Sequence, residues 1–193
     1  VRPSQSEEIS VNWHQSFGRD IRHVGLPMDT DTDDSYYLSV DYDKQLQAGS
    51  INSLAVNAYT SFVDHVMSNK RRPNYKMVHA VSNVTSRTLG GQAEAQFSIL
   101  DKGTLFAGAD YYLVSKDGER DRTVLVNMMT GESFDSPKNF TDQVWQGAYQ
   151  HDAGLFSELH YPLSERLSLV TGLRVNAIVA NAEEPAAVFE ETY

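Results

Sequence analysis

The sequence contains no cysteine, and its 16 Lys and Arg are outnumbered by 26 Asp and Glu, which gives a formal net charge of −10. The absence of cysteine excludes disulfide frameworks, Cys-ligated zinc sites and Cys nucleophiles within this chain. The shortage of basic residues argues against nucleic acid as a partner, because duplex binding requires a positively charged surface. Long apolar runs are also missing: none exceeds four residues, so no transmembrane helix is expected.

Glycine and proline are scarce, with 12 and 6 among 193 residues, which is too few for a linker or a low-complexity array. Hydrophobic residues make up 40% and charged residues 22%, as in an ordered domain. The length fits one domain or a piece of a larger protein. The first residues, VRPSQS, lack Met and an apolar signal core, so we expect a segment cut from a longer precursor.

Apolar and polar side chains alternate with a period of two along several segments, which predicts β-strands with one apolar face. In the segment 52–66, Leu54, Val56 and Phe62 fall on the apolar face, whereas Asn57 and His65 fall on the polar face. The pattern predicts an all-β fold of about seven antiparallel, up-and-down strands, at residues 9–14, 36–43, 52–66, 87–100, 104–116, 152–161 and 167–177.

The expected connections alternate in length. Short turns are predicted at residues 45–50, 101–103 and 164–166, and long polar loops at residues 17–34, 68–86 and 117–150. Short turns on one side of the membrane and long loops on the other are typical of outer-membrane β-barrels. Because an odd number of strands does not close such a barrel, and an open sheet leaves unpaired edges, we expect the chain to be part of a larger barrel.

Aromatic residues on the apolar face support the same interpretation. One set lies near the expected long loops and another near the short turns: Trp13, Tyr36, Phe62 and Tyr111 in the first, and Tyr42, Phe97 and Tyr161 in the second. Two such girdles are typical of a barrel wall that crosses both lipid–water boundaries.

Several motifs, in this order and spacing, resemble the barrel of TonB-dependent outer-membrane receptors. They are GLPMD at 25–29 followed by DD at 33–34, GLFSEL at 154–159, YPLSERL at 161–167 and GLRV at 172–175. The segment DHVMSN at 64–69 most resembles the TonB-dependent copper receptors, which carry a His-x-Met pair on a barrel strand.

The resemblance implies a 22-stranded transmembrane barrel with a globular plug, driven by the TonB complex and placed in the lipid of the bacterial outer membrane. Residues 1–193 would then be a partial barrel domain without the plug, the TonB-contacting segment and the remaining strands. The sequence has no Gly-x-Ser-x-Gly, no His-Glu-x-x-His and no phosphate-binding glycine loop, so we expect no enzymatic activity and no cofactor.

The candidate metal ligands are His65 and Met67, which point to the same face of a strand because they lie two positions apart along it. By the alternation that face is the lumen. Imidazole and thioether are a soft donor set that suits copper, particularly Cu(I), better than calcium or magnesium. The resemblance implies that a Cys and a Met of the plug complete the site. The simpler alternative is that both residues merely end the strand.

Further methionines and acidic residues lie in the expected loops. Met77, His79, Met128 and Met129 are possible loop contacts for a metal, although scattered loop methionines often have no role. The run Asp29-x-Asp31-x-Asp33 lacks the glycine and the glutamate of a calcium loop, so we expect a surface loop of mutually repelling carboxylates. For the run KRR at 70–72 a solvated loop tip is the favoured expectation. The alternatives are that it offsets the charge of the acidic run or contacts lipopolysaccharide phosphates.

The favoured hypothesis is therefore TonB-dependent uptake of a scarce nutrient, most simply copper. A receptor for an iron–siderophore or another metal complex is the first alternative. A soluble all-β binding module that happens to alternate is the second, and a passive barrel without a plug is the third.

Overall fold

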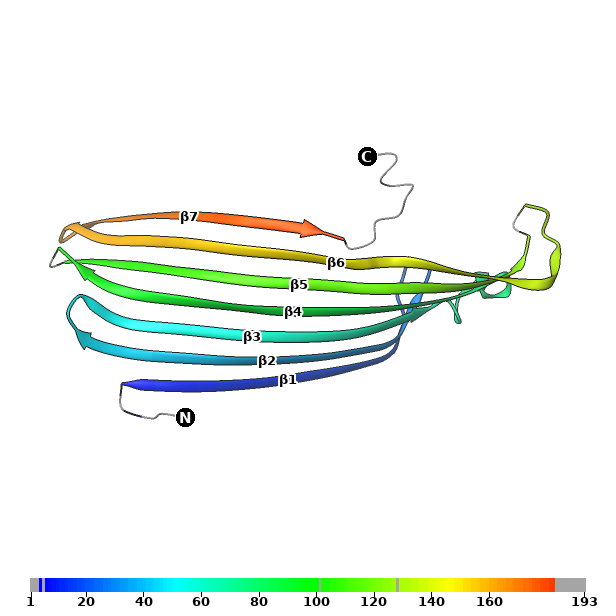
Figure 1. Cartoon of the computed structure of the whole chain (residues 1–193), viewed down its shortest axis with the longest axis horizontal. Helices are drawn as coiled ribbons and strands as arrows, with labels where there is room; N and C mark the ends of the chain where they lie inside the picture. The colour runs from blue at the N-terminus through cyan, green and yellow to red at the C-terminus, as the bar shows by residue number, and fades with distance from the viewer. Residues whose placement is uncertain (1–3, 5, 101, 128, 183–193) are drawn as a thin grey trace.

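The computed structural model of the chain describes residues 4, 6–100, 102–127 and 129–182, which form one sheet (Figure 1). Seven strands lie in the described residues, together with one short 3-10 helix, η1 (Pro73–Lys76). The strands are β1 (Glu7–Ile21), β2 (Asp29–Ala48), β3 (Ile51–Ser68), β4 (Val78–Ile99), β5 (Gly103–Val126), β6 (Ser133–Ser164) and β7 (Leu167–Asn181).

Each strand pairs with the next one along the chain, and every pairing is antiparallel, so the sheet order is β1 to β7. This confirms the predicted all-β, up-and-down topology. It agrees with a partial barrel, because the sheet within the described residues is open and both of its outermost strands have one unpaired edge.

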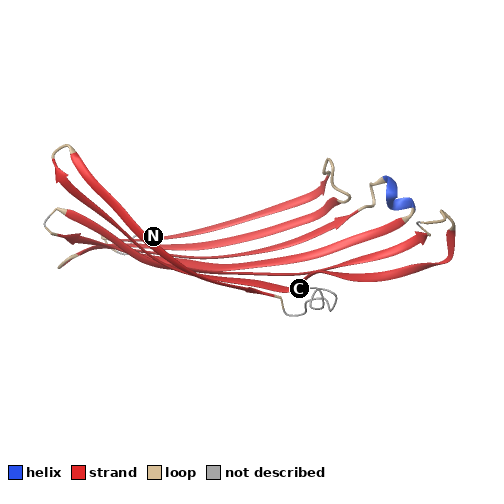
Figure 2. Cartoon of the chain, turned by 90° about the horizontal axis from the view of Figure 1, so that it is seen from above, coloured by secondary structure: helices blue, strands red, loops and turns tan. Residues whose placement is uncertain are grey.

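The sheet is a single curved layer (Figure 2). Among the described residues, Ala80 is the one hydrophobic residue that counts as buried, at 9% exposure. A β-sandwich would bury an apolar face against a second sheet, and the described part of the chain supplies no such sheet. Within the same residues, no helix is long and apolar enough to cross a membrane.

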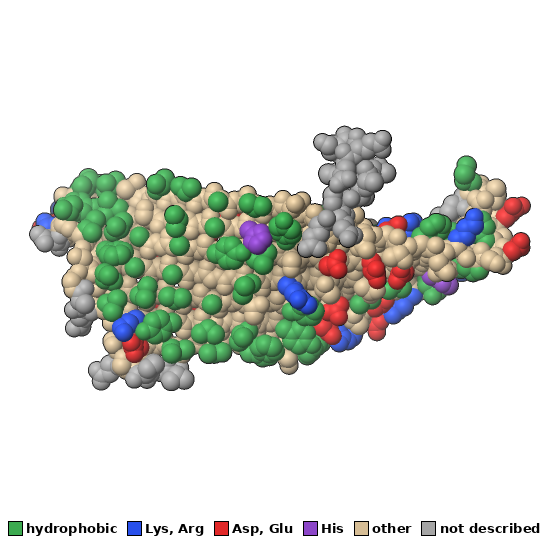
Figure 3. Space-filling view, viewed as in Figure 1, with side chains coloured by type: hydrophobic (Ala, Val, Ile, Leu, Met, Phe, Trp, Pro, Cys, Tyr) green, Lys and Arg blue, Asp and Glu red, His purple; other side chains and the backbone are tan. Residues whose placement is uncertain are grey.

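The apolar side chains form a band of constant length on one face, which we call the outer face. On β3, β4 and β5 the band covers residues 54–62, 89–97 and 105–113, nine residues in each strand. That length matches the 9–11 residues with which a tilted strand crosses a bilayer. The outer face is apolar next to the short turns and carries charged side chains toward the other end of the sheet (Figure 3).

The strands continue beyond the band, and here the sequence prediction of long loops is wrong. The expected loops at 17–34, 68–86 and 117–150 are mostly strand, and the connections are residues 22–28, 69–77 and 127–132. The reason is that both faces of these strand extensions contact water. Their side chains therefore lose the apolar–polar alternation, although the backbone ladder continues.

The aromatic residues of the outer face adjoin one another where the band ends. The ring centroids of Trp13 and Tyr36 are 6.2 Å apart, and those of Tyr36 and Phe62 are 6.4 Å apart. Beyond this row, the next outer-face residues of β2 and β3 are Asp34 and Asp64. The row of rings therefore marks a boundary between an apolar and a charged surface, as expected of a girdle.

Candidate functional site

The inner face of the band is polar, and ladders of hydrogen bonds connect its strands. The Asn57 side chain on β3 donates to Asp41 on β2 at 2.6 Å, and Asn12 on β1 donates to the same carboxylate at 3.2 Å. Near the opposite edge of the sheet, on the same inner face, the Asn176 side chain on β7 donates to Asp152 on β6 at 2.8 Å. A wall that is apolar outside and hydrogen-bonded inside is what a water-filled barrel requires.

Above the band, a largely buried ion pair joins the β1–β2 connection to the β3–β4 connection. The Arg72 guanidinium contacts the carboxylate of Asp29, which is only 2% exposed. The backbone N–H of His23 donates to the same carboxylate at 2.9 Å, and the His23 ring lies 2.9 Å from the Thr30 hydroxyl. Residues 22–28 and 69–77 are thereby held together, which we call the Arg72 clasp.

The acidic run at 29–33 is not a surface loop of repelling charges. It lies at the start of β2, and each carboxylate has a partner. Asp31 pairs with Lys70 at 2.7 Å and with Arg71 at 3.2 Å, and Asp33 contacts His65. The basic run at 70–72 is likewise engaged by carboxylates. The favoured expectation of a solvated loop tip is therefore wrong, and the alternative that this run offsets the acidic charge is confirmed.

His65 and Met67 lie on β3, three and five residues beyond the last ring of the girdle, in an uninterrupted stretch of pairing with β4. They share the inner face, as their spacing predicts. Nδ1 of His65 lies 3.0 Å from Oδ2 of Asp33 on β2. A proton shared at Nδ1 leaves the Nε2 lone pair free to bind a metal, the arrangement in which a carboxylate orients a ligating histidine.

Met67 belongs to a row that crosses four strands in register. Met67 is opposite Ser82, Ser82 is opposite Arg120, and Arg120 is opposite Asp142. With about 4.8 Å between neighbouring strands, the Cα atoms of Met67 and Arg120 lie about 10 Å apart. The thioether of Met67 and the guanidinium of Arg120 are therefore parts of one inner surface.

A cavity of about 260 Å³ lies along this surface, lined by Met28, Asn69, Ala80, Arg120, Arg122 and neighbours. Arg120 and Arg122 both bind the Asp142 carboxylate, at 3.2 and 2.8 Å. The hydrogen bond from Arg122, with that from Arg120, holds the pKa of Asp142 below its ordinary value. Two guanidinium groups share one carboxylate, so the cavity wall keeps a positive excess.

The other candidate metal contacts are spread out. Met77 precedes β4 and is 38% exposed, and the ring of His79 stacks on Tyr75 at 3.9 Å. Met129 is 95% exposed, and Met128 lies outside the described residues. Over those parts of the chain that the structure describes, no three His, Asp or Glu side chains converge as a metal site would require. The loop contacts therefore stay predictions.

The comparison with protein families identifies the family to which this sheet belongs. A model of the family described as "TonB dependent receptor-like, beta-barrel" matches residues 2–188. The chain belongs to this family. The predicted membership is confirmed, and with it the relation to receptors and transporters of the bacterial outer membrane.

A solved structure with a similar fold is that of the protein named "Copper transporter OprC". It aligns with a TM-score of 0.75 and 24% sequence identity over 94% of this chain and 28% of that chain. This likeness shows the fold. The chain thus spans 28% of the length of this solved relative. No curated protein sequence matches the chain.

Sequence reasoning missed three residues of this surface. Asp33 was counted with the repelling carboxylates, although it is the partner of His65. Met28 and Arg120 fell in expected loops, and both line the cavity. The alternating acidic and basic residues of the segment 117–123 were a usable signal, because opposite charges on facing strands stabilise a ladder.

Proposed function

We propose that the chain forms part of the wall of an outer-membrane receptor that takes up copper actively, with energy from the TonB complex. Family membership supports the receptor role, and the likeness to the copper transporter favours copper. The observation that carries the substrate assignment is the His65–Asp33 contact, beside Met67 on the same face.

The geometry suits a receiving site at the outer end of the passage. His65 and Met67 stand beyond the apolar band on the inner face, so an ion could reach them before it enters the membrane-spanning part. Imidazole Nε2 and a thioether bind Cu(I) in preference to hard cations. Two donors leave further positions for ligands elsewhere in the intact receptor, which suits a cargo that must be released.

A titration of the intact receptor with Cu(I) against a competing chelator tests this proposal. His65→Ala and Met67→Ala are each expected to weaken binding at least tenfold. His14→Ala is the matched control, because His14 lies on the inner face of β1 opposite Tyr37, away from His65 and Met67. Unchanged affinity in both site variants would contradict the copper assignment.

The second candidate is a receptor for an anionic metal complex, such as an iron–siderophore. The cavity beside Arg120 and Arg122 favours it, because the positive excess there attracts a negatively charged chelate. If Arg120→Gln abolished uptake of a ferric chelate and the His65 and Met67 variants had no effect on copper, this candidate would replace the first.

A further inference from the structure

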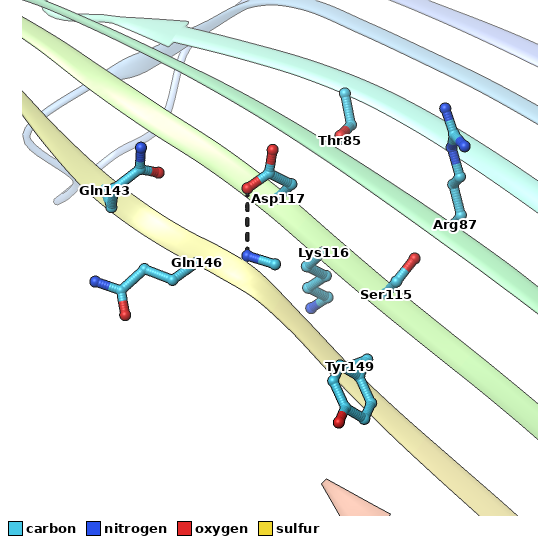
Figure 4. Close-up of a pocket in the computed structure, with 9 residues that line it drawn as sticks. Thr85, Arg87, Ser115, Lys116, Asp117, Gln143, Gln146 and Tyr149 are labelled. Carbon is cyan, nitrogen blue, oxygen red and sulfur yellow. Dashed lines mark hydrogen bonds between the residues drawn. The ribbon is translucent and has the colours of Figure 1, made fainter. Parts of the chain in front are cut away.

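A polar hollow opens on the outer face of the sheet, outside the passage. Its volume is about 550 Å³, and its lining comes from β4, β5 and β6 (Figure 4). On β4 the band ends at Leu89, and the next outer-face residue is Arg87, which pairs in register with Ser115 of β5. Arg87 therefore stands about 7 Å beyond the last lipid-facing side chain of its strand.

The hollow exists because β6 carries extra residues at this height. Lys116 of β5 is opposite Ala148 and Gly118 is opposite Trp145, so three steps along β6 match two along β5. Gly147 adopts a φ of 57°, and its N–H donates to Oδ1 of Asp117 at 3.3 Å. The irregularity lies where the surface changes from apolar to charged.

Among the described residues, no carboxylate forms an ion pair with Arg87. Each of the other four strand arginines in the described residues pairs with an Asp, whereas Arg87 has no ion pair there. Its guanidinium lies 5.6 Å from the centroid of the Phe62 ring, which belongs to the girdle. A guanidinium without an ion pair among the described residues is available to bind an anion by charge-assisted hydrogen bonds.

The remaining lining consists mainly of neutral groups that form hydrogen bonds. Hydroxyls and amides come from Ser115, Gln143, Gln146 and Tyr149. Ser115 lies on the Arg87 side of the hollow, and the two glutamines lie on the opposite side, beyond Asp117 (Figure 4). Lys116 also borders the hollow, but the strand alternation places its side chain on the inner face, where its ammonium lies 4.8 Å from the centroid of the Trp145 ring. The volume is far larger than a phosphate ion needs, and neutral donors and acceptors of this kind suit sugar hydroxyls.

We propose that this hollow binds the phosphosugar headgroup of an anionic glycolipid in the leaflet that borders the strand extensions. Arg87 binds the phosphate, and the amides and hydroxyls bind the sugar. The acyl chains then lie on the apolar band below, over Leu89 and Leu113. This position selects a lipid as the source of the phosphate, because a free ion gains nothing from the band.

Asp117 carries a negative charge in the same hollow as Arg87, so the charge preference of the site can be tested. Its carboxylate lines the same hollow and repels an anion, while its Oδ1 accepts the Gly147 N–H. Asp117→Asn keeps an acceptor oxygen and removes the charge, so it is expected to tighten binding of the headgroup. Arg87→Gln keeps hydrogen-bonding capacity and removes the cation, so it is expected to weaken binding. A purely structural role for either residue does not predict opposite signs.

The experiment measures lipid binding to the intact receptor by native mass spectrometry after removal of bound lipid. The probes are diphosphorylated lipid A, its dephosphorylated form, phosphatidylglycerol and inorganic phosphate. Lipid A is expected to bind most tightly. Its affinity should fall about tenfold in Arg87→Gln, because charge-assisted hydrogen bonds to the phosphate are lost. Its affinity should rise a few fold in Asp117→Asn. Arg166→Gln, in the turn between β6 and β7, is the control and is expected to bind as the wild type does.

Equal binding of lipid A by wild type and Arg87→Gln would overturn the proposal. If the dephosphorylated form bound as tightly as lipid A, the proposed role of the phosphate would be wrong. If phosphatidylglycerol bound as tightly, the proposed role of the sugar would be wrong. Complete displacement of lipid A by inorganic phosphate would show that the site binds a free anion and does not recognise a lipid. A melting curve of each variant in detergent checks that the barrel is intact. None of these outcomes depends on the cargo of the receptor.

Discussion

Arg174 on β7 forms two hydrogen bonds of 2.8 Å with Asp110 on β5, and the pair passes over β6 at Gly154. A Cβ atom on Gly154 would meet Nη2 of Arg174 at 2.5 Å and Oδ1 of Asp110 at 2.9 Å. The absence of a side chain at residue 154 thus lets a charged pair connect two strands that are not neighbours.

Gly154→Ala is therefore expected to displace this pair and destabilise the barrel by about 1 kcal/mol, a modest value because the Arg174 side chain is 47% exposed. Urea unfolding of the intact receptor in detergent measures the loss. Arg174→Gln should cost about as much, and the double variant no more than either single one. Additive losses would mean that Gly154 acts independently of the pair.

Removal of the arginine from the Arg72 clasp should open both connections locally. Arg72→Met leaves the Asp29 carboxylate, with a side chain 3% exposed, without its cation. Losing one partner of a buried pair costs about 3–5 kcal/mol. Hydrogen exchange of residues 22–30 is expected to accelerate, while the band stays protected. Lys76→Met, an exposed residue of η1, is the control, and equal exchange in both variants would refute the clasp.

Acid should loosen the tips of β5 and β6. Because the pKa of Asp142 is lowered in the folded state, its pairing with Arg122 and Arg120 stabilises the tips fully above the ordinary carboxyl pKa. That contribution is lost as the pH falls below about 4 and through the lowered pKa. Hydrogen exchange of residues 118–126 against pH measures it. Asp142→Asn should abolish the acid-dependent part, and a variant that kept it would point to another group.

Asp33 should control the copper affinity without touching the metal. Asp33→Asn removes the negative partner of His65 Nδ1, and such outer partners are worth about 10- to 100-fold in affinity. Asp34→Asn is the matched control, because the neighbouring Asp34 pairs with Arg19 instead. A titration with Cu(I) at neutral pH distinguishes the two. Equal affinity in wild type and Asp33→Asn would show that His65 does not bind through Nε2.

The assignment of faces can be tested with two adjacent residues. Ala93 lies on the outer face near mid-band, opposite Val56 and Ala109, and Gln92 lies on the inner face opposite Asn57 and Asp110. Ala93→Arg is expected to cost about 2–4 kcal/mol in lipid vesicles, because it places a cation in hydrocarbon. Gln92→Arg meets water and Asp110 and should cost far less. Equal costs would reverse or abolish the assignment.

The sequence predicted the membrane-spanning part well, because lipid on one side and water on the other impose strict alternation. Leu54, Val56 and Phe62 could be assigned to one face on this ground alone. The same logic failed beyond the girdle. At Asp33 or Arg120 both faces are wet, so polar residues occupy every position and the strand reads as a loop.

Only those features of the candidate site that lie within a single strand could be predicted from the sequence. The shared face of His65 and Met67 follows from their spacing on β3. The contact with Asp33 depends on the register of two strands, which no local pattern reveals. The Arg72 clasp and the cavity at Arg120 likewise combine residues that only the pairing brings together.

Among the described residues this sheet buries one hydrophobic residue. The surrounding acyl chains therefore take the place of a hydrophobic core. For such a wall, the length of the lipid tails plays the part that side-chain volume plays in a globular protein. Bilayers thicker or thinner than the nine-residue band strain this sheet as a badly fitting side chain strains a packed interior, at a fraction of a kcal/mol per ångström.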